Sequence, residues 1–310
     1  MEIFQTPNID FVSKRRYAYI ISLVMILIGA VSLIVHGGPN YGIDFKGGTS
    51  LVLRFQKSVT TPEIRNALAS IGMGTSEIKN FGTRNEYLIY IAQQKGTSAS
   101  EIAQNIEKAI SQAFTENPFE VMKVDTVGPK VGRELRKAAL LATLLSLLLI
   151  LIYVGWRFEF IFSFGAVIAL FHDVFITLGI FSLLNFEISL KEIAAFLTLV
   201  GYSLNDTIVV FDRIRENLKV LRNDDLPTII NRSVNQVLSR TIITGFTTFF
   251  VLVVLFVLGG EVIRGFSFAM LVGILVGTYS SVYVASPIVL EWQQRRGGKR
   301  ELRMAKRKSH

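Results

Sequence analysis

Long apolar runs alternate with polar stretches along the chain, and their lengths predict a membrane protein. Uninterrupted apolar runs of about 18 residues or more are typical of transmembrane helices. The sequence has six such runs, at approximately 18–35, 138–154, 160–184, 193–211, 242–258 and 266–289. This pattern predicts an α-helical polytopic membrane protein with six transmembrane helices.

The polar stretch between the first and second apolar runs predicts a separate small domain. Strand-like and helix-like segments follow one another in the order β-α-β-β-α-β, at 50–55, 61–71, 76–81, 87–92, 99–114 and 120–127. This order is that of a ferredoxin-like α+β unit. We therefore expect residues 1–36 to hold the N-terminus and first helix, 37–134 the ferredoxin-like domain, 135–290 the other five helices, and 291–310 a basic tail.

Positive charge orients the predicted helices. The chain has a formal charge of +9, and Lys and Arg gather before the first helix, between the fourth and fifth, and in the C-terminal tail. Basic segments next to transmembrane helices stay in the cytoplasm. Both termini are therefore predicted to be cytoplasmic and the ferredoxin-like domain extracytoplasmic. The basic tail favours anionic lipids as a partner, and no nucleic acid is expected.

The fourth helix contains a carboxylate, Asp206, within its apolar sequence. A charged side chain inside a bilayer costs roughly 2.5–3.5 kcal/mol on insertion scales. Such residues usually face a partner helix or a water-filled path, which makes an ion or proton pathway the favoured interpretation. The alternative is that Asp206 has only a structural role and forms a hydrogen bond that stabilises packing against a neighbouring helix. Asn205 lies one position round the same helix.

Arg240 precedes the fifth apolar run at a depth comparable to that of Asp206. An ion pair between them would offset part of the cost of burying each group. If Asp206 took up a proton, the pair would weaken, which gives a two-state element that an ion gradient can bias. The alternative, in which Arg240 reaches the lipid headgroups, is about as well supported by the sequence.

The third helix carries His172 and Asp173 near its middle. Adjacent helical residues are turned about 100° apart, so the two side chains are not expected to face one partner. Asp173 is the stronger pathway candidate, with His172 as its hydrogen-bond partner or a second proton-carrying group. On the sixth helix, the small residues at 273–281 are interpreted as a helix-packing surface.

A glycine-containing loop at 40–50 joins the first helix to the domain and includes Asp44, Gly47 and Gly48. It lacks the spacing of a phosphate-binding loop, and a tight structural turn is the favoured interpretation. The sequence has no nucleophile–base pair, metal cluster or cofactor motif, and cysteine is absent. The chain is therefore not predicted to be an enzyme or to bind a cofactor.

Three motifs together resemble the SecF family, the smaller-subunit family of the SecD–SecF protein-export complex. They are DFKGGT from Asp44, the His172–Asp173 pair, and GYSLNDTIVVFDRIREN from Gly201. The resemblance implies a multi-pass protein of the cell inner membrane that pairs with SecD, in an arrangement similar to resistance-nodulation-division transporters. It also implies that the pair assists the SecYEG channel, and in bacteria the SecA motor, by using proton motive force to move a polypeptide outward. The family's membrane-embedded acid and arginine fall on Asp206 and Arg240.

Two other functions fit parts of the sequence. Half of a proton-driven small-molecule efflux transporter would have helices of this kind, although such a unit needs twelve helices and two external domains. A non-energised scaffold of the translocon would use the intramembrane acids as packing glue. The scaffold hypothesis predicts that Asp206→Asn leaves activity intact, and the proton hypothesis predicts that it does not.

Overall fold

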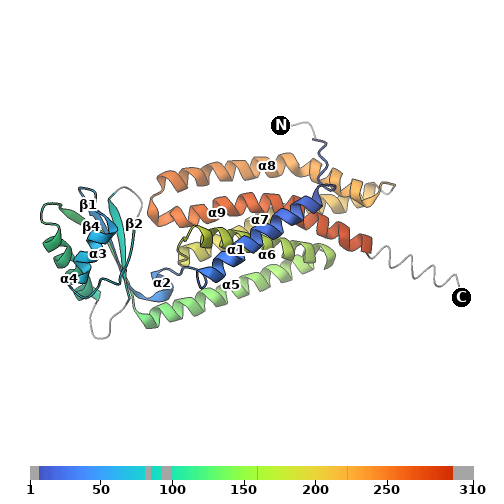
Figure 1. Cartoon of the computed structure of the whole chain (residues 1–310). Helices are drawn as coiled ribbons and strands as arrows, with labels where there is room; N and C mark the ends of the chain where they lie inside the picture. Colours follow the sequence, from blue (N-terminus) through green and yellow to red (C-terminus); the bar gives the residue numbers. More distant parts are fainter. Residues whose placement is uncertain (1–6, 81–84, 93–98, 159, 222, 296–310) are drawn as a thin grey trace.

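The computed structural model describes residues 7–80, 85–92, 99–158, 160–221 and 223–295. Within these residues, six helices long and apolar enough to span a membrane lie side by side, with a small α+β domain at one end (Figure 1). The spanning helices are α1 (Arg15–Val35), α5 (Pro129–Arg157), α6 (Phe160–Leu183), α7 (Leu190–Val220), α8 (Leu226–Leu258) and α9 (Glu261–Ser280). The predicted fold class is confirmed. Most of the predicted basic tail, beyond residue 295, lies outside the described residues.

Three of these helices extend many residues beyond one end of their apolar runs. α5 begins at Pro129, α7 ends at Val220 and α8 begins at Leu226, each well beyond the predicted bound. In α8, the Asp225 side chain accepts a hydrogen bond from the backbone N–H of Thr228 (3.3 Å), which caps the first turn, and the turns from Asn231 to Arg240 are rich in polar residues. The predicted long basic loop between the fourth and fifth helices is therefore wrong, because only residues 221–225 join α7 to α8. Apolar length reports the membrane-embedded part of a helix and misses polar turns that project beyond it.

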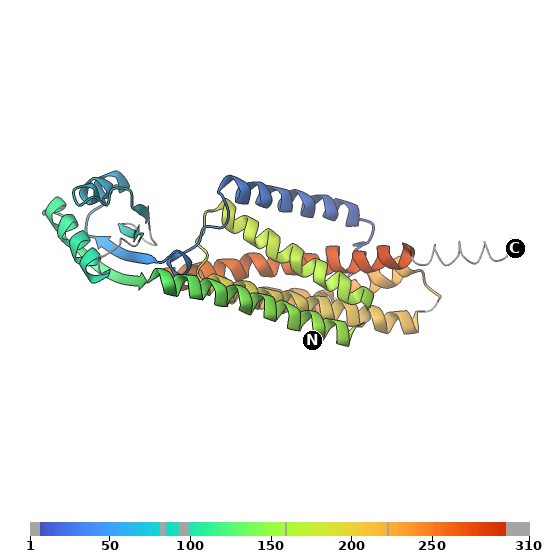
Figure 2. The ribbon, with the colours of Figure 1, turned by 90° about the horizontal axis from the view of Figure 1, so that it is seen from below.

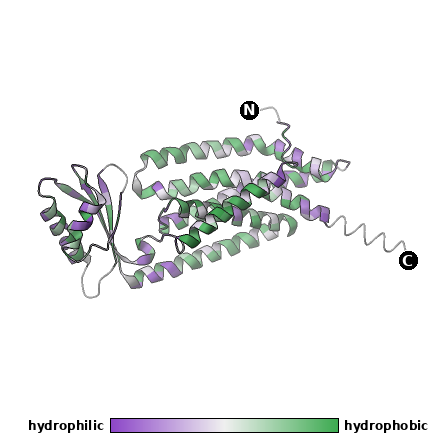
Figure 3. Cartoon of the chain, viewed as in Figure 1, coloured by the Kyte–Doolittle hydropathy of each residue, from purple (hydrophilic) through white to green (hydrophobic). Residues whose placement is uncertain are grey.

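Helices α6, α7 and α9 form the inside of the bundle, while α1, α5 and α8 lie on the outside. The spanning parts of the inner three are half or more buried, and those of the outer three are mostly exposed. The exposed surface of the outer helices is apolar (Figure 3). Figure 2 shows α1 alongside α6 on one flank of the bundle and α5 on the opposite flank. Because the backbone polar groups of a helix are paired internally, this surface suits lipid or another membrane helix.

Small residues set the closest approaches between helices. At the crossing of α1 and α6, a Cβ on Gly29 would lie 2.7 Å from the Cα of Gly179. On α9, a Cβ on Gly273 would lie 2.3 Å from a methyl group of Leu199, and Gly277 also faces α7. The interpretation of the small residues of the last helix as a packing surface is confirmed.

The small domain is a four-stranded sheet packed against two helices. Its elements are β1 (Gly48–Phe55), α3 (Thr61–Ala69), β2 (Glu77–Asn80), β3 (Glu86–Ile91), α4 (Ala99–Ala113) and β4 (Phe119–Val127). The strand order β2-β3-β1-β4, with each neighbouring pair antiparallel, is the order that a split β-α-β arrangement produces. Its core is formed by Leu51, Leu53, Ile64, Leu68, Ile89, Ile102, Ile106 and Ile110. The predicted ferredoxin-like unit is confirmed.

Candidate functional site

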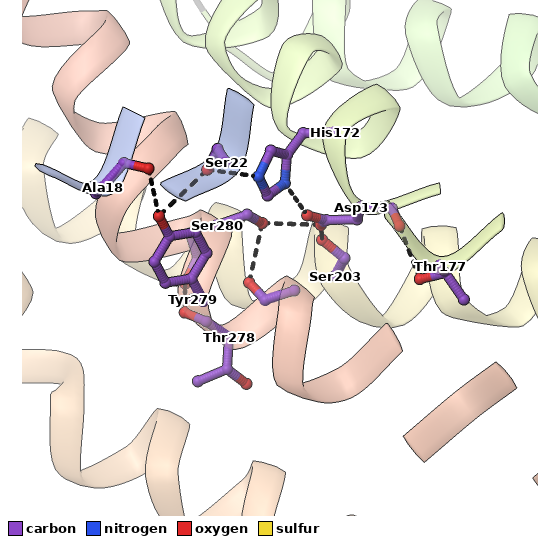
Figure 4. A network of polar contacts seen from close by, with 11 residues as sticks. Ala18, Ser22, His172, Asp173, Thr177, Ser203, Thr278, Tyr279 and Ser280 are labelled. Atoms are coloured by element: carbon purple, nitrogen blue, oxygen red, sulfur yellow. Dashed lines mark hydrogen bonds and ion pairs between the residues drawn. The ribbon is translucent and has the colours of Figure 1, made fainter. Parts of the chain in front are cut away.

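Asp173 lies at the centre of a polar cluster inside the bundle, where α6 faces α7 and α9 (Figure 4). Its side chain is 1% exposed. Asp173 Oδ2 accepts hydrogen bonds from the hydroxyl groups of Ser203 on α7 and Ser280 on α9, the latter at 2.8 Å. Asp173 Oδ1 lies 2.8 Å from Nδ1 of His172. A buried carboxylate is costly unless it is hydrogen-bonded, and these contacts explain how the fold tolerates one here.

His172 extends this cluster to α1. Its Nε2 atom lies 2.9 Å from Oγ of Ser22, which in turn lies 3.2 Å from Oη of Tyr279 on α9. The Tyr279 hydroxyl donates to the carbonyl of Ala18 at 2.8 Å. The imidazole also stacks on the Tyr279 ring, with 6.0 Å between centroids. The cluster therefore joins four helices, α1, α6, α7 and α9.

The contacts of this cluster run in series from Asp173 through His172, Ser22 and Tyr279 to the carbonyl of Ala18. Each of these side chains can take part in a hydrogen bond with both of its neighbours in the series. The series therefore connects α6 to α1 and α9 through polar contacts.

The sequence predicted two members of this cluster and missed the rest. His172 is the hydrogen-bond partner of Asp173, as predicted, and the two side chains bond different helices. Their part in proton transfer stays a prediction. The hydroxyl partners were missed; they are Ser22, Ser203, Tyr279 and Ser280. The available signal was the spacing of Ser280, three residues after Gly277 on the face of α9 that packs against α7.

Asp206 lies on α7, three residues beyond Ser203, and is 3% exposed. Within the described residues, its buried Oδ2 atom has no hydrogen-bond partner, and neither has the adjacent hydroxyl of Thr207. Buried polar atoms are nearly always bonded, because an unpaired one loses its water without replacement. The fold therefore buries the Asp206 carboxylate without a compensating protein hydrogen bond at Oδ2.

The predicted ion pair between Asp206 and Arg240 is not formed in this structure. Arg240 interacts electrostatically with Asp206. In the described part of the chain, however, no nitrogen atom of the Arg240 guanidinium group lies within 4.0 Å of a carboxylate oxygen. Asp206 is buried in the bundle, whereas Arg240 is exposed on α8, so the two side chains do not meet. The alternative interpretation, in which Arg240 reaches outward, fits this exposure.

Gly201 and Asn205 lie on a different face of α7 from Asp206. Both are exposed, and a Cβ on Gly201 would meet nothing within 4 Å. A separation of four residues places them on one helix face. The Asn205 side chain makes no hydrogen bond to any residue that the structure describes, so this face is open to lipid or to a partner outside the chain.

The glycine-containing loop lies where the bundle meets the small domain, and it includes the short helix α2 (Ile43–Lys46). Gly47 and Gly48 have φ angles of +71° and +128°, and a Cβ on Gly48 would lie 2.4 Å from the carbonyl of Ile91. Only glycine fits such a position, which agrees with a structural turn. Asp44 has a further contact, because its Oδ2 accepts a hydrogen bond from the backbone N–H of Leu190, the first residue of α7 (2.9 Å).

Relatives match this chain over almost its whole length. The family profile described as protein export membrane protein SecD/SecF, C-terminal, matches residues 106–295, and that of the SecD/SecF GG motif matches residues 32–59. The protein translocase subunit SecF of Rhodothermus marinus is 46% identical over 99% of this chain and 100% of that protein. The SecF subunit of Desulfurispirillum indicum is also 46% identical, over 93% of this chain and 92% of its own length.

The chain belongs to the SecF family. Solved structures extend the similarity to the fold. The crystal structure of SecDF from Thermus thermophilus, described as a translocon-associated membrane protein, is 40% identical and matches 94% of this SecF-family chain with a TM-score of 0.86. SecDF in a super-membrane-facing form is 39% identical and matches 96% of it with a TM-score of 0.71. In both cases this chain spans 40% of the SecDF chain.

Proposed function

We propose that this SecF-family chain is a non-catalytic, proton-coupled accessory subunit of the Sec protein translocase. It would act with a SecD partner to promote the movement of polypeptides across the inner membrane. The SecF relatives are named as protein translocase subunits, and the SecDF neighbour is described as translocon-associated. Because this chain spans only 40% of SecDF, SecD would supply the rest of the functional unit.

The buried carboxylate of Asp206, with its unpartnered Oδ2 atom, is the observation that carries the proton-coupling part of this proposal. A scaffold helix gains nothing from an unpaired acid in its apolar sequence, whereas a proton site needs one. Arg240, which already acts on Asp206 electrostatically, would pair with it directly in another state of the cycle. Protonation of Asp206 would then release Arg240.

The His172–Asp173 pair would be a supporting proton site. Its contacts belong to the series through Ser22 and Tyr279 that ties α1 to α6 and α9, so a change in its protonation would alter hydrogen bonds between these helices. Proton movement at the His172–Asp173 pair would therefore change the packing of α1. At Asp206 it would change the proposed ion pair with Arg240. Both sites use α7, because Ser203 on that helix bonds Asp173.

The proton gradient supplies enough free energy to drive such a step. Moving one charge across 100 mV supplies about 2.3 kcal/mol, which shifts a two-state equilibrium roughly 50-fold.

The external ferredoxin-like domain would contact the emerging polypeptide or move with the proton cycle. The further partners in this proposal are the SecYEG channel, SecA in a bacterium, and anionic lipids at the cytoplasmic tail. Both chain termini would lie in the cytoplasm.

The proposal is tested by export of a secreted reporter into inverted membrane vesicles that hold the Asp206→Asn variant with SecD and the channel. Asn keeps the shape and hydrogen-bonding ability of Asp but takes up no proton. We expect normal assembly with SecD and export that no longer rises when a proton gradient is imposed.

Asp212→Asn is the matched control, since Asp212 lies on the same helix and forms an exposed ion pair with Arg157 at 3.0 Å. This variant should respond to the gradient like the parent protein. A normal response from Asp206→Asn would instead support the scaffold hypothesis.

A further inference from the structure

A chain of alternating charges crosses from the small domain to the membrane bundle. Lys79 on β2 places its Nζ atom 2.8 Å from a carboxylate oxygen of Glu187, in the turn between α6 and α7. The same Nζ atom lies 2.8 Å from Glu77 on its own strand. Lys46, in the glycine-containing loop, lies 3.8 Å from the other carboxylate oxygen of Glu77. The sheet, the loop and the α6–α7 turn are thus held by one set of ion pairs.

Backbone hydrogen bonds reinforce the contact between the loop and the turn. The N–H of Ile188 donates to the carbonyl of Asn40 at 2.7 Å, and the N–H of Gly42 donates to the carbonyl of Ile188 at 2.9 Å. Two residues further on, α7 begins at Leu190, whose N–H is bound by the Asp44 carboxylate. The N-terminal end of α7, next to the small domain, is therefore fixed to the loop by both main-chain and side-chain contacts.

The loop is in turn fixed to the sheet and to α5. The Tyr90 hydroxyl on β3 donates to the carbonyl of Gly47 at 2.5 Å. The guanidinium group of Arg136, on α5, lies 4.9 Å from the centre of the Tyr41 ring. The chain runs from β4 directly into α5, but α7 has no such covalent connection to the small domain.

We propose that the outer joint, formed by Asp44, Lys46, Glu77, Lys79 and Glu187, transmits displacement of α7 to the external domain. Asp44 and Lys79 are then positioning residues for the gradient-driven step. The inference rests on the proposed function, because α7 is the helix that carries Asp206. A helix is stiff along its axis, so a shift near Asp206 reaches Leu190, and the joint passes it on to the sheet.

The joint transmits movement without sensing pH itself. Burial favours the neutral amine of Lys79, but its bonds to Glu187 and Glu77 outweigh this effect and raise its pKa above the ordinary 10.5. Burial also opposes ionisation of Glu77, but Lys79 and Lys46 lower its pKa below the ordinary 4.5. The pair between Lys79 and Glu77 is therefore lost only as pH falls through the lowered pKa of Glu77 or rises through the raised pKa of Lys79. Between those limits Glu77 and Lys79 both stay charged.

The test uses the full complex in vesicles and compares Lys79→Glu with the charge swap Lys79→Glu/Glu187→Lys. We expect Lys79→Glu to reduce the gradient-dependent part of export by about fivefold or more, with gradient-independent export and SecD assembly kept. The swap restores the attraction across the joint and should recover at least half of the lost response, equally at about pH 6 and pH 8. Lys123→Glu is the matched control, because Lys123 lies on β4 of the same domain and, among the residues that the structure describes, pairs within its own strand, with Asp125.

The Asp206→Asn variant in the same experiment separates the two proposals. If Asp206→Asn keeps the gradient response, the proposed function fails. Two results would contradict the outer joint and leave the proposed function standing, provided that Asp206→Asn loses the gradient response. In the first, Lys79→Glu responds like the parent protein; in the second, the charge swap recovers none of the lost response.

Should Lys79→Glu not assemble, Asp44→Ala and Asp44→Asn replace it, since Asn keeps an oxygen acceptor for the N–H of Leu190. Loss of the response with Ala and its retention with Asn support the joint, and equal responses contradict it.

Discussion

Replacement of Asp173 by alanine is expected to lower the stability of the bundle by about 2–5 kcal/mol. The change removes the acceptor that joins Ser203 and Ser280 and leaves the Nδ1 atom of His172 buried without its partner. It also opens a cavity where four helices meet. Thermal unfolding of the purified protein in detergent measures the effect.

Asp173→Asn is the control for this prediction. Its amide oxygen can still accept from the two serines, and its amide N–H can donate to His172. We expect it to lose less than about 1 kcal/mol, since it preserves the hydrogen-bond pattern. If alanine and asparagine are equally well tolerated, the cluster does not hold the bundle together.

Gly29→Ala is expected to destabilise the bundle by about 1–3 kcal/mol, as overpacking does in other tightly packed sites. The new Cβ would lie 2.7 Å from the Cα of Gly179, so α1 must move away from α6. That movement would also strain the contact between Ser22 and His172 on the same pair of helices. The same unfolding measurement applies.

Gly201→Ala is the matched control on another membrane helix. Nothing lies within 4 Å of its new Cβ, and alanine favours a helix over glycine by about 1 kcal/mol. It should therefore be neutral or stabilising in the isolated chain. Effects of the same sign and size at the two glycines would contradict the close α1–α6 crossing.

Hydrophobic length and the order of elements were enough to predict the fold. Each spanning helix contains an apolar run of about the length that a helix needs to cross a membrane, and the polar insert has the order of a ferredoxin-like unit. The helix ends were not predictable in the same way. The early start of α8 depends on the cap at Asp225, followed by polar turns that apolar length does not register.

The candidate site was predictable only in part, because a sequence gives depth along a helix more readily than direction around it. Asp173, His172 and Asp206 stood out as ionisable groups in apolar runs. The positions of the apolar runs predict a similar depth for Arg240 and Asp206, but the packing of α7 and α8 leaves Arg240 exposed while Asp206 is buried. Serines are common in membrane helices, so only the packed structure reveals that Ser203 and Ser280 bond the Asp173 carboxylate.

The role of the glycine-containing loop also needed the structure. Asp44 and Leu190 are 146 residues apart, and nothing in either local sequence indicates that they touch. The glycines themselves were predictable as a turn, since Gly48 requires a positive φ. The loop therefore combines a local property visible in the sequence with a long-range contact that is not.

Protonation of Asp206 is the central claim, and infrared difference spectroscopy tests it most directly. The reconstituted complex with SecD is measured before and after acidification of the outer solution. The protonated carboxyl band should contain a component that is present in the parent protein and in Asp212→Asn and missing in Asp206→Asn. If Asp206→Asn gives the same spectrum as the parent protein, Asp206 does not take up the proton and the coupling mechanism proposed for this SecF-family chain is wrong.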